Sequence, residues 1–222
     1  MIEQLLPPGV AAAESFGDPP DLVALPGEES LISRAVDKRR REFTTARHCA
    51  RQALVQLGVE PVAIMRGERG MPLWPNQIVG SITHCDGYRA ATVAYAMAVR
   101  SLGIDAEPHD ALPDGVLDHT SLPQERAVLA GRPDTLHWDR LLFCAKEATY
   151  KAWFPLTQRW LGFEDAHITF EQTPADASTP RGTFCSRILI DGRTVDGSAP
   201  LSELHGRWMV DRGLIITSIV TV

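Results

Sequence analysis

Two long stretches of the chain carry apolar residues at the spacing of an amphipathic helix. The first is expected to start near Ser30, which can cap a helix, and to end at the turn-prone Gly58-Val-Glu-Pro61. Its apolar positions are Leu31, Ala35, Phe43, Ala46, Ala50, Leu54 and Leu57. The second runs from Asp139 to Trp153, and Pro155 is expected to help stop it. A shorter helix is predicted from Pro123 to Ala130.

Short apolar runs bounded by turn residues predict strands on either side of the second long helix. The strands before it are Ile78–Thr83, Ala90–Ala96 and Val99–Ala106, and Asp86-Gly87 makes the turn between the first two. The strands after it are His167–Glu171, Gly182–Ile190, Gly206–Val210 and Leu214–Val222. Each half of the chain therefore combines a helix with antiparallel strands, which indicates an α+β fold.

Three segments are expected to be connections. Residues 1–28, rich in proline, glycine and acidic residues, are predicted to form an irregular lead-in, and residues 66–75 are rich in turn residues. The polar segment 108–115 is expected to cross from one half to the other. We therefore divide the chain into an N-terminal subdomain, 1–107, and a C-terminal subdomain, 108–222, which form one compact unit.

Composition and charge narrow the class of protein. The chain has 222 residues, which suits one domain of moderate size or two intimate halves with a real core. The net charge of −6 argues against general nucleic-acid binding, which usually leaves a basic footprint. There is no run of eighteen apolar residues, so no membrane span is expected. The first residues lack the basic start and long apolar core of a signal peptide.

The cysteines give no sign of a metal-binding or redox motif. Cys49, Cys85, Cys144 and Cys185 are widely scattered, and no two have the spacing of a zinc finger or a redox pair. A structural zinc site is therefore not expected. Reduced, mostly buried thiols in a cytoplasmic protein are the preferred interpretation.

Candidate chemistry gathers at three carboxylates. Asp105 and Glu107 alternate at the end of a predicted strand, so they project from one face, and neither has a basic neighbour in sequence. Glu147 and Lys151 lie four residues apart on the second long helix, beside Lys146. Taken alone, these could be a solvated strand end and a surface ion pair. Together they offer hard oxygen ligands for Mg²⁺, or Mn²⁺, and cations for phosphate.

Three motifs follow one another along the chain: Gly80-Ser-Ile-Thr-His-Cys85, Gly103-Ile-Asp-Ala-Glu107 and Phe143-Cys-Ala-Lys-Glu-Ala-Thr-Tyr-Lys151. In this order they resemble the signature of the Sfp-type (group II) 4′-phosphopantetheinyl transferases. The similarity extends from about Asp18 to the C-terminus and looks closest to actinobacterial, mycobacterial-type members. It implies two similar subdomains related by a pseudo-two-fold axis, with coenzyme A bound in the cleft between them.

The resemblance also implies roles for individual residues. Glu147 would be a metal ligand, with Asp105 and Glu107, and a general base for the acceptor serine. Lys146 and Lys151 would contact phosphate oxygens or steady the leaving group, and Tyr150 would line the same region. Coenzyme A would further be contacted by Ser81, Thr83 and His84, by Arg39, Arg47 and Arg66, and by Trp160 along the pantetheine chain.

One position departs from the family pattern. Gly70-Met-Pro72 stands where a Gly-Lys-Pro sequence is common, and Met71 cannot neutralise phosphate. Arg66 or Arg69 could substitute for the missing lysine. For at least half of the cations in the basic segment between Lys38 and Arg51, a solvated helix face is the plainer interpretation. Nucleic-acid binding is a rival interpretation, weakened by the acidic total charge.

The expected reaction is transfer of phosphopantetheine from coenzyme A to a serine of an apo acyl or peptidyl carrier protein, with 3′,5′-ADP as the leaving group. The carriers would belong to fatty-acid, polyketide and nonribosomal-peptide synthases, including those that make siderophores. The resemblance further implies a monomeric enzyme. Two alternatives stay open: a metal-dependent phosphohydrolase, and a coenzyme A-binding module without catalysis.

Overall fold

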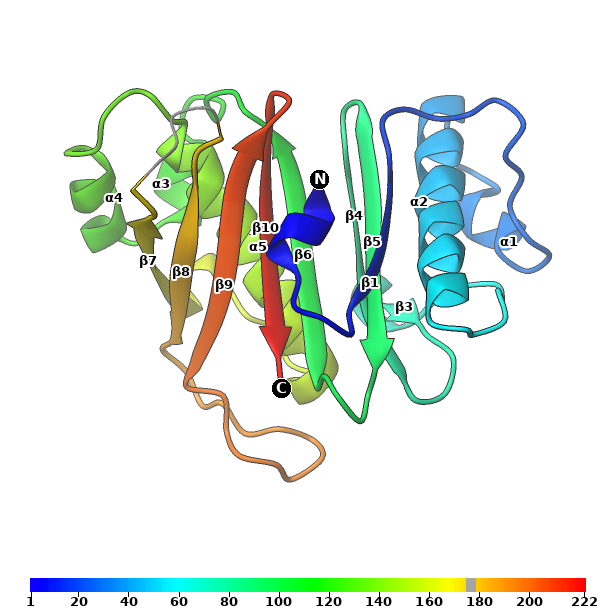
Figure 1. Ribbon diagram of the computed structural model, residues 1–222. Coiled ribbons are helices and arrows are strands. Elements are labelled where there is room, and N and C mark those ends of the chain that lie inside the picture. The colour runs from blue at the N-terminus through cyan, green and yellow to red at the C-terminus, as the bar shows by residue number, and fades with distance from the viewer. Residues whose placement is uncertain (175–178) are drawn as a thin grey trace.

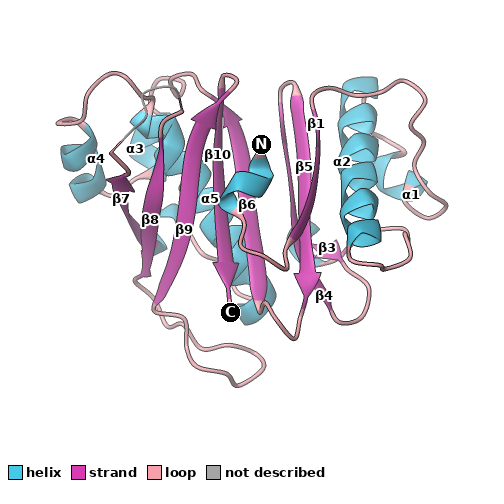
Figure 2. Cartoon of the chain, viewed as in Figure 1, coloured by secondary structure: helices cyan, strands magenta, loops and turns pink. Residues whose placement is uncertain are grey.

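The computed structural model describes residues 1–174 and 179–222. It has an α+β fold of two similar halves, and in each half one helix of 20 residues packs on an antiparallel sheet (Figure 1). These helices are α2, Asp37–Gln56, and α5, Trp138–Thr157. Figure 2 shows the strands of both sheets side by side, with α2 beside the three-stranded sheet and α5 behind the five-stranded one.

The N-terminal half contains a three-stranded sheet in the order β1-β5-β4. These strands are β1, Ala11–Ser15, β4, Ile78–Cys85, and β5, Tyr88–Tyr95. Helix α2 buries small residues against this sheet, which lets helix and strands approach closely. The remaining elements of this half are η1, Ile2–Leu5, α1, Glu29–Ile32, β2, Met65–Arg66, η2, Glu68–Gly70, and β3, Pro72–Leu73.

The C-terminal half contains a five-stranded sheet in the order β6-β10-β9-β8-β7. Its strands are β6, Ser101–Pro108, β7, Ala166–Gln172, β8, Arg181–Ile188, β9, Glu203–Asp211, and β10, Leu214–Thr221. Helix α5 packs on the inner face of this sheet, around the fully buried Trp153 and Trp208. The short helices are α3, Val116–Thr120, α4, Pro123–Leu129, and η3, Phe163–Asp165.

The two sheets meet at β4 and β6, which share no backbone hydrogen-bond ladder. An apolar cluster shared by β5 and β6 joins the halves, and side-chain hydroxyls link β4 to β6 directly. The backbone N–H of Ile104 donates to Ser81 Oγ at 3.1 Å, and the N–H of Ala106 donates to Thr83 Oγ1 at 3.1 Å. Because β6 pairs with β10, its hydrogen bonding groups it with the C-terminal half. The boundary after residue 107 stays a prediction, and this pairing favours a division between residues 95 and 101.

The first predicted helix is wrong at its start. The chain forms α1 and α2 with a break over residues 33–36, and α2 begins at Asp37, not near Ser30. The break is held by Arg40, whose guanidinium donates to the carbonyl oxygens of Ala35 at 2.8 Å and Ser33 at 2.6 Å. Those two carbonyls therefore have partners outside a helix.

Two further expectations are corrected at the level of elements. The lead-in over residues 1–28 is not wholly irregular, because it contains η1 and β1, and β1 pairs with β5. Pro155 does not stop α5, which continues to Thr157 and ends where Gln158 takes a left-handed conformation with φ 52°. The predicted hairpin at Asp86-Gly87 and the short helix at Pro123 are confirmed. No helix within residues 1–174 and 179–222 is both long and apolar enough to cross a membrane.

Candidate active site

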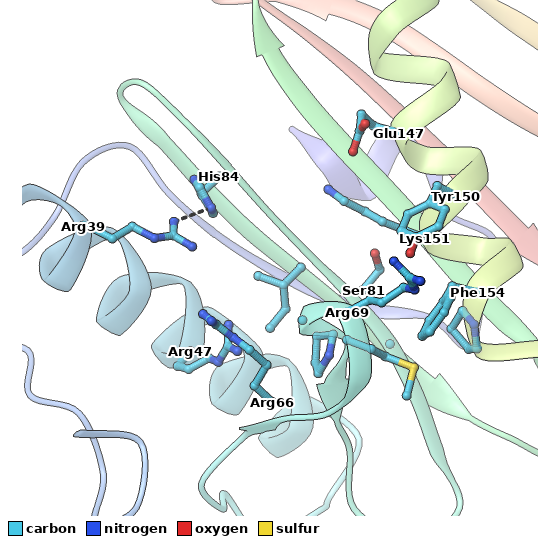
Figure 3. Close-up of a pocket in the computed structure, with 16 residues that line it drawn as sticks. Arg39, Arg47, Arg66, Arg69, Ser81, His84, Glu147, Tyr150, Lys151 and Phe154 are labelled. Carbon is cyan, nitrogen blue, oxygen red and sulfur yellow. Dashed lines mark hydrogen bonds between the residues drawn. The ribbon is translucent and has the colours of Figure 1, made fainter. Parts of the chain in front are cut away.

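A cavity of about 280 Å³ opens between the two halves (Figure 3). One side is formed by α2 and the β2–β3 region, and the other by one face of α5. Basic side chains gather on the first side, and a carboxylate, a lysine and aromatic rings lie on the second. The side chains that line it include Arg39, Arg47, Arg66, Arg69, Ser81, His84, Glu147, Tyr150, Lys151 and Phe154.

Asp105 and Lys151 form an ion pair at the back of this site. Lys151 Nζ donates to Asp105 Oδ1 at 2.7 Å and to the carbonyl of Ile104 at 3.0 Å. Thr83 Oγ1 donates to the same Oδ1 at 3.0 Å. Burial disfavours the charged form of Lys151, but the carboxylate of Asp105 outweighs it and holds the lysine pKa above its usual value. Lys151 is therefore a cation at neutral pH.

The glycine of the Gly103-Ile-Asp-Ala-Glu107 motif explains how helix and strand come so close. A Cβ on Gly103 would lie 2.0 Å from the carbonyl oxygen of Ala148 and 2.8 Å from the backbone nitrogen of Ala152. No real side chain tolerates such contacts, so only glycine lets α5 lie directly on β6 at this point. This close packing sets Glu147 and Lys151 beside Asp105.

Glu107 and Glu147 both have a raised pKa. Burial is the main cause in each case, and the nearby carboxylate of Asp105 adds to it. Arg140 opposes the shift at Glu107, since its Nη1 lies 2.9 Å from Glu107 Oε2. For Glu147 the opposing cation is Lys151. Two carboxylates whose pKa is raised beside the carboxylate of Asp105 indicate a place where a bound cation would be favourable.

The donor set fits a hard divalent cation. Asp105 Oδ2 is buried and has no hydrogen-bond partner among the described residues, although a buried carboxylate oxygen normally has one. With Glu107 and Glu147 it supplies the all-oxygen surroundings that Mg²⁺ and Mn²⁺ prefer. Among the described residues, only one group of three metal-ligating side chains has donor atoms within 4.8 Å of one another, and that group does not include these carboxylates. One oxygen from each of Asp105, Glu107 and Glu147 therefore does not meet this distance. Water molecules or side-chain rotation would complete the shell.

Arginines gather at the opposite end of the cavity. Arg47 is buried, donates from Nε to the carbonyl of Ile64 at 3.2 Å and lies over the Phe43 ring at 4.2 Å. Burial, together with the nearby Arg66 and Arg39, lowers its pKa to about 10, so it stays charged at neutral pH. Among the described residues neither Arg47 nor Arg66 has a carboxylate in ion-pair range. A buried cation without a partner is costly, and an anionic ligand would offset that cost.

His84 is neutral in this arrangement. Its Nε2 lies 2.6 Å from Arg39 Nη1, and because arginine can only donate, Nε2 is the acceptor and the ring proton sits on Nδ1. Burial is the main cause that lowers the pKa of His84 to about 4, and Arg39 and Lys151 add to it. Glu42 lies 3.6 Å from Arg39 and orients this pair. A phosphate placed here would face both groups.

Aromatic side chains close the end of the cavity near α5. The Tyr150 ring lies 5.1 Å from that of Trp160 and 5.7 Å from that of Phe154, and Arg69 stacks over Trp160 at 5.3 Å. The Tyr150 hydroxyl is buried without a partner among the described residues. A side pocket of about 120 Å³ continues past Tyr150 and Trp160. A flexible ligand chain with amide groups would find apolar walls and a free hydroxyl here.

Two predicted site residues are engaged elsewhere. Lys146 is buried, and its Nζ lies 2.8 Å from Glu125 and donates to the carbonyl oxygens of Phe163 and Ala166. Its donors are occupied, so its ammonium reaches no ligand in the main cavity, although Lys146 lines the side pocket. Thr83 does not line the cavity either; its hydroxyl joins β4 to β6 and orients Asp105.

Sequence analysis missed several residues of the site. Arg140 and Phe154 lie seven residues before and after Glu147, so the helical period could have placed both on its face of α5. Ile82 and Pro72, which line the cavity wall, carried no such signal. The partnership of Glu125 with Lys146 joins two elements and also has no local signature.

Comparison with known proteins assigns the class of protein that this fold and site define. Residues 27–94 match the family model of the 4′-phosphopantetheinyl transferase N-terminal domain, and residues 101–194 match that of the 4′-phosphopantetheinyl transferase superfamily. The chain belongs to the 4′-phosphopantetheinyl transferase family. It is an enzyme that transfers phosphopantetheine to carrier proteins, with coenzyme A as the substrate.

Comparison with individual relatives shows which members of the family this chain is similar to. It is 60% identical over 219 residues to the 4′-phosphopantetheinyl transferase Npt of Nocardia iowensis, covering 99% of each chain. It is 63% identical over 212 residues to PptT of Mycobacterium tuberculosis, covering 95% of this chain and 92% of the relative. It is 48% identical over 226 residues to Svp of Streptomyces mobaraensis, covering 99% and 88%. The resemblance to actinobacterial members is thereby confirmed.

Proposed function

We propose that this enzyme performs a Mg²⁺-dependent transfer in the cavity between its halves, with coenzyme A lying from the arginines of α2 to the carboxylates of β6 and α5. One observation carries the proposal: Arg47 and Arg66 line one end of the cavity without a carboxylate in ion-pair range among the described residues, and Glu147 and Lys151 line the other end, in front of Asp105 and Glu107. The first end suits the 3′-phosphate of coenzyme A, and the second suits its pyrophosphate.

The arginines would hold the nucleotide end. Arg47 and Arg66 would form charge-assisted hydrogen bonds to the 3′-phosphate, beside Arg39 and His84. Arg69, whose backbone has φ 51°, would take the place of the lysine that Met71 replaces. Ser81 lines the cavity between the two ends, and Trp160 with Tyr150 would line the pantetheine chain.

Glu147 would be the base and Lys151 the cation beside the leaving group. The serine hydroxyl of the carrier attacks the phosphorus that bears pantetheine, and its proton goes to a Glu147 oxygen. The bond from that phosphorus to the bridging oxygen breaks, and 3′,5′-ADP leaves with the electron pair. A raised pKa suits a proton acceptor that must work near neutral pH. Lys151, fixed by Asp105, would offset the charge that develops on the departing phosphate.

Asp105, Glu107 and Glu147 would hold the metal ion. When bound, Mg²⁺ neutralises and polarises the pyrophosphate oxygens, as in other phosphoryl transfers. Lys146 would act indirectly, by fixing the chain at Phe163 and Ala166 against α5 through its contacts there.

The proposal extends to the carrier proteins that the enzyme modifies, its oligomeric state and its cellular compartment. The acceptors would be apo carrier domains of fatty-acid, polyketide and nonribosomal-peptide synthases. The enzyme would act as a monomer, since one chain supplies every wall of the cavity. Four free cysteines, of which Cys49 and Cys144 are buried, suit the reducing cytoplasm.

Intact mass measurement tests the reaction. The enzyme is incubated with coenzyme A, Mg²⁺ and an apo carrier protein, and the carrier is weighed. A mass gain of one phosphopantetheine, lost when Mg²⁺ is chelated, supports the proposal. Nucleotide release without carrier labelling would instead indicate a phosphohydrolase, and coenzyme A binding without either product would indicate a binding module.

Glu147→Gln tests the base. Gln keeps the shape and one carbonyl oxygen, so coenzyme A should still bind at saturating Mg²⁺, whereas turnover should fall by about 10²–10⁴-fold because the amide cannot accept the serine proton. Calorimetric binding and carrier labelling are measured on the same preparation. If high Mg²⁺ restores the wild-type rate, Glu147 is only a metal ligand and the base is another group.

A further inference from the structure

In the part of the chain that the structure describes, the outer face of β8 and of the first half of β9 is open to solvent. Helix α5 packs on the inner face, where Phe184, Leu204 and Trp208 are buried. Residues that alternate with these on β8, and on β9 as far as Arg207, point outward and are exposed or half-buried, whereas Met209 further along β9 is buried in the apolar cluster that contains Ile2 and Leu5 of η1. Figure 1 shows this face toward the viewer, to the left of η1. It is thus a surface separate from the cleft in which coenzyme A is proposed to lie.

Three metal-ligating side chains converge on this face. Cys185 on β8 is directly opposite His205 on β9 in the strand register, and Glu203 lies two residues before His205 on the same side. One donor atom from each residue lies within 4.8 Å of the other two. Nothing in the spacing along the sequence indicated this group, because only the pairing of β8 with β9 brings Cys185 to the other two.

The strands hold the cluster in a geometry that a metal ion can use. Two ligands at positions i and i+2 of one strand and a third from the adjacent strand surround one point above the sheet. The three residues sit on paired, regular backbone, so little order must be gained on binding. A groove of about 380 Å³ beside Cys185 and His205 leaves a side open to solvent.

The carboxylate of Glu203 is free to bind a metal ion, because no Lys or Arg among the described residues forms an ion pair with it. Arg187 lies opposite Glu203 in the register, yet no ion pair joins them in the part of the chain that the structure describes. Among the described residues, the side chain of His205 lies closest to a pairing distance, with its Nε2 3.8 Å from Glu203 Oε2. Both side chains are largely exposed, and neither is committed to another element.

We propose that Cys185, Glu203 and His205 form a binding site for Zn²⁺ on the outer face of the C-terminal sheet. Sulfur, imidazole nitrogen and carboxylate oxygen are the three ligand types that zinc takes, and three protein ligands leave the fourth tetrahedral position for water or an incoming ligand. The site differs in chemistry from the all-oxygen cluster at Asp105, so Mg²⁺ does not compete for it. It lies across the sheet from α5, and transfer activity does not depend on it.

Cobalt spectroscopy tests the site. The reduced full-length enzyme is titrated with Co²⁺ in excess Mg²⁺, which occupies oxygen-only sites. A sulfur-to-cobalt charge-transfer band in the near ultraviolet, with intense visible bands of a tetrahedral ion, is expected at one ion per chain, and Zn²⁺ should displace it. Cys185→Ser should abolish the charge-transfer band.

Matched variants locate the binding. Loss of outer-shell partners already costs about 10–100-fold in metal affinity, so His205→Ala, which removes a direct ligand, should weaken Zn²⁺ by at least about 100-fold. Cys85→Ser, at the other half-buried cysteine, should leave both spectrum and affinity unchanged. Cys185→Ser and His205→Ala, the two variants on the outer face, should both keep the wild-type rate of carrier labelling.

Two outcomes would overturn the proposal. One is a cobalt spectrum without thiolate ligation, or one that survives in Cys185→Ser. The other is metal that binds only between two copies, seen as a dimer by size-exclusion chromatography at the metal concentrations that produce the band.

Discussion

The two oxygen atoms of Asp105 have different surroundings. Oδ1 accepts from Lys151 and Thr83, whereas Oδ2 is buried and no described residue is its hydrogen-bond partner. No basic residue is close to Asp105 in the sequence. Its ion pair with Lys151 could not be predicted, because it forms through the packing of α5 on β6. The carboxylate therefore has a structural role as well as its proposed role as a metal ligand.

Asp105→Ala should abolish transfer and also destabilise the fold. It leaves the Lys151 ammonium, 27% exposed, without its counter-ion. Removing one partner of a fully buried pair costs about 3–5 kcal/mol, and partial exposure reduces this to roughly 1–3 kcal/mol here. Urea unfolding measures the loss, and Asp105→Ala combined with Lys151→Met should recover stability but not activity. Unchanged unfolding of the single variant would contradict the structural role.

Arg47→Ala should weaken coenzyme A far more than dephospho-coenzyme A, which lacks the 3′-phosphate. A charge-assisted hydrogen bond to phosphate is worth about 1.5–3 kcal/mol, or roughly 10–150-fold in affinity. Calorimetry with both ligands checks this. Arg41→Ala is the matched control, since Arg41 is exposed on the same helix and does not line the cavity. An equal loss for the two ligands would place Arg47 away from the 3′-phosphate.

At the scale of single residues, sequence predicts those that share a local pattern. Asp105 with Glu107, and Glu147 with Lys151, follow from strand and helix periods. The ion pairs of Glu107 with Arg140 and of Lys146 with Glu125 do not, because their partners come from separate elements. Lys146 is an example. The motif predicts that it binds phosphate, but its ammonium group contacts Glu125 and two backbone carbonyl oxygens.

Helix α5 depends on the absence of a side chain beneath it. Gly103→Ala should move α5 away from β6, because the added Cβ would overlap the carbonyl of Ala148. Overpacking of this kind costs about 1–3 kcal/mol. The displacement should also lower the rate of carrier labelling, since Glu147 and Lys151 move with the helix. Thermal unfolding and labelling are measured together.

Gly131→Ala controls for the loss of a glycine. A Cβ at Gly131 meets only the carbonyl of Val128, at 3.7 Å, and should change neither quantity. A Gly103→Ala enzyme with wild-type melting temperature and rate would mean that α5 and β6 can separate without effect on the site.

Elements with strong periodicity could be predicted, and elements set by distant contacts could not. The sequence predicted α5 and the β4–β5 hairpin, because apolar spacing and turn residues agree there. It missed β1, whose strand Ala11–Ser15 offers little hydrophobic contrast and is held by pairing with β5. It also missed the break before α2, where no proline or glycine occurs and Arg40 supplies the capping hydrogen bonds from the following helix.

At the scale of the whole molecule, lowering the pH should reduce the free energy of unfolding, because His84 is held neutral in the folded protein. Its pKa is about 4 in the folded protein against an ordinary 6.5, so the unfolded chain takes up a proton first as pH falls. The contribution of the neutral ring is present above about pH 6.5 and is lost progressively toward pH 4. Glu107 and Glu147, with raised pKa values, act in the opposite sense over the lower part of this range.

His84→Gln should therefore reduce the fall in melting temperature between pH 7 and pH 4.5. His119→Gln, at an exposed histidine outside the cavity, should leave the wild-type profile unchanged. Identical profiles for wild type and His84→Gln would show that the His84 ring titrates normally in the folded protein.

The overall architecture could be predicted only as far as its class. Alternation of helices and strands indicated an α+β fold, but periodicity carries no information on which strands of different halves lie together. The likeness of the halves came from resemblance to a family, since no repeat is visible in the sequence. The cavity exists because the halves meet at β4 and β6, which no local pattern encodes.

The hydroxyl contacts between β4 and β6 have a mechanical consequence. Each sheet keeps its own backbone ladder if the contacts of Ser81 and Thr83 release, so β4 and β6 can separate locally at these two hydrogen bonds while the apolar cluster shared by β5 and β6 keeps the halves together. Each such bond contributes about 0.5–1.5 kcal/mol. The backbone amides of Ile104 and Ala106 report this motion. They should exchange with deuterium faster than the other β6 amides, and coenzyme A bound between the halves should slow their exchange.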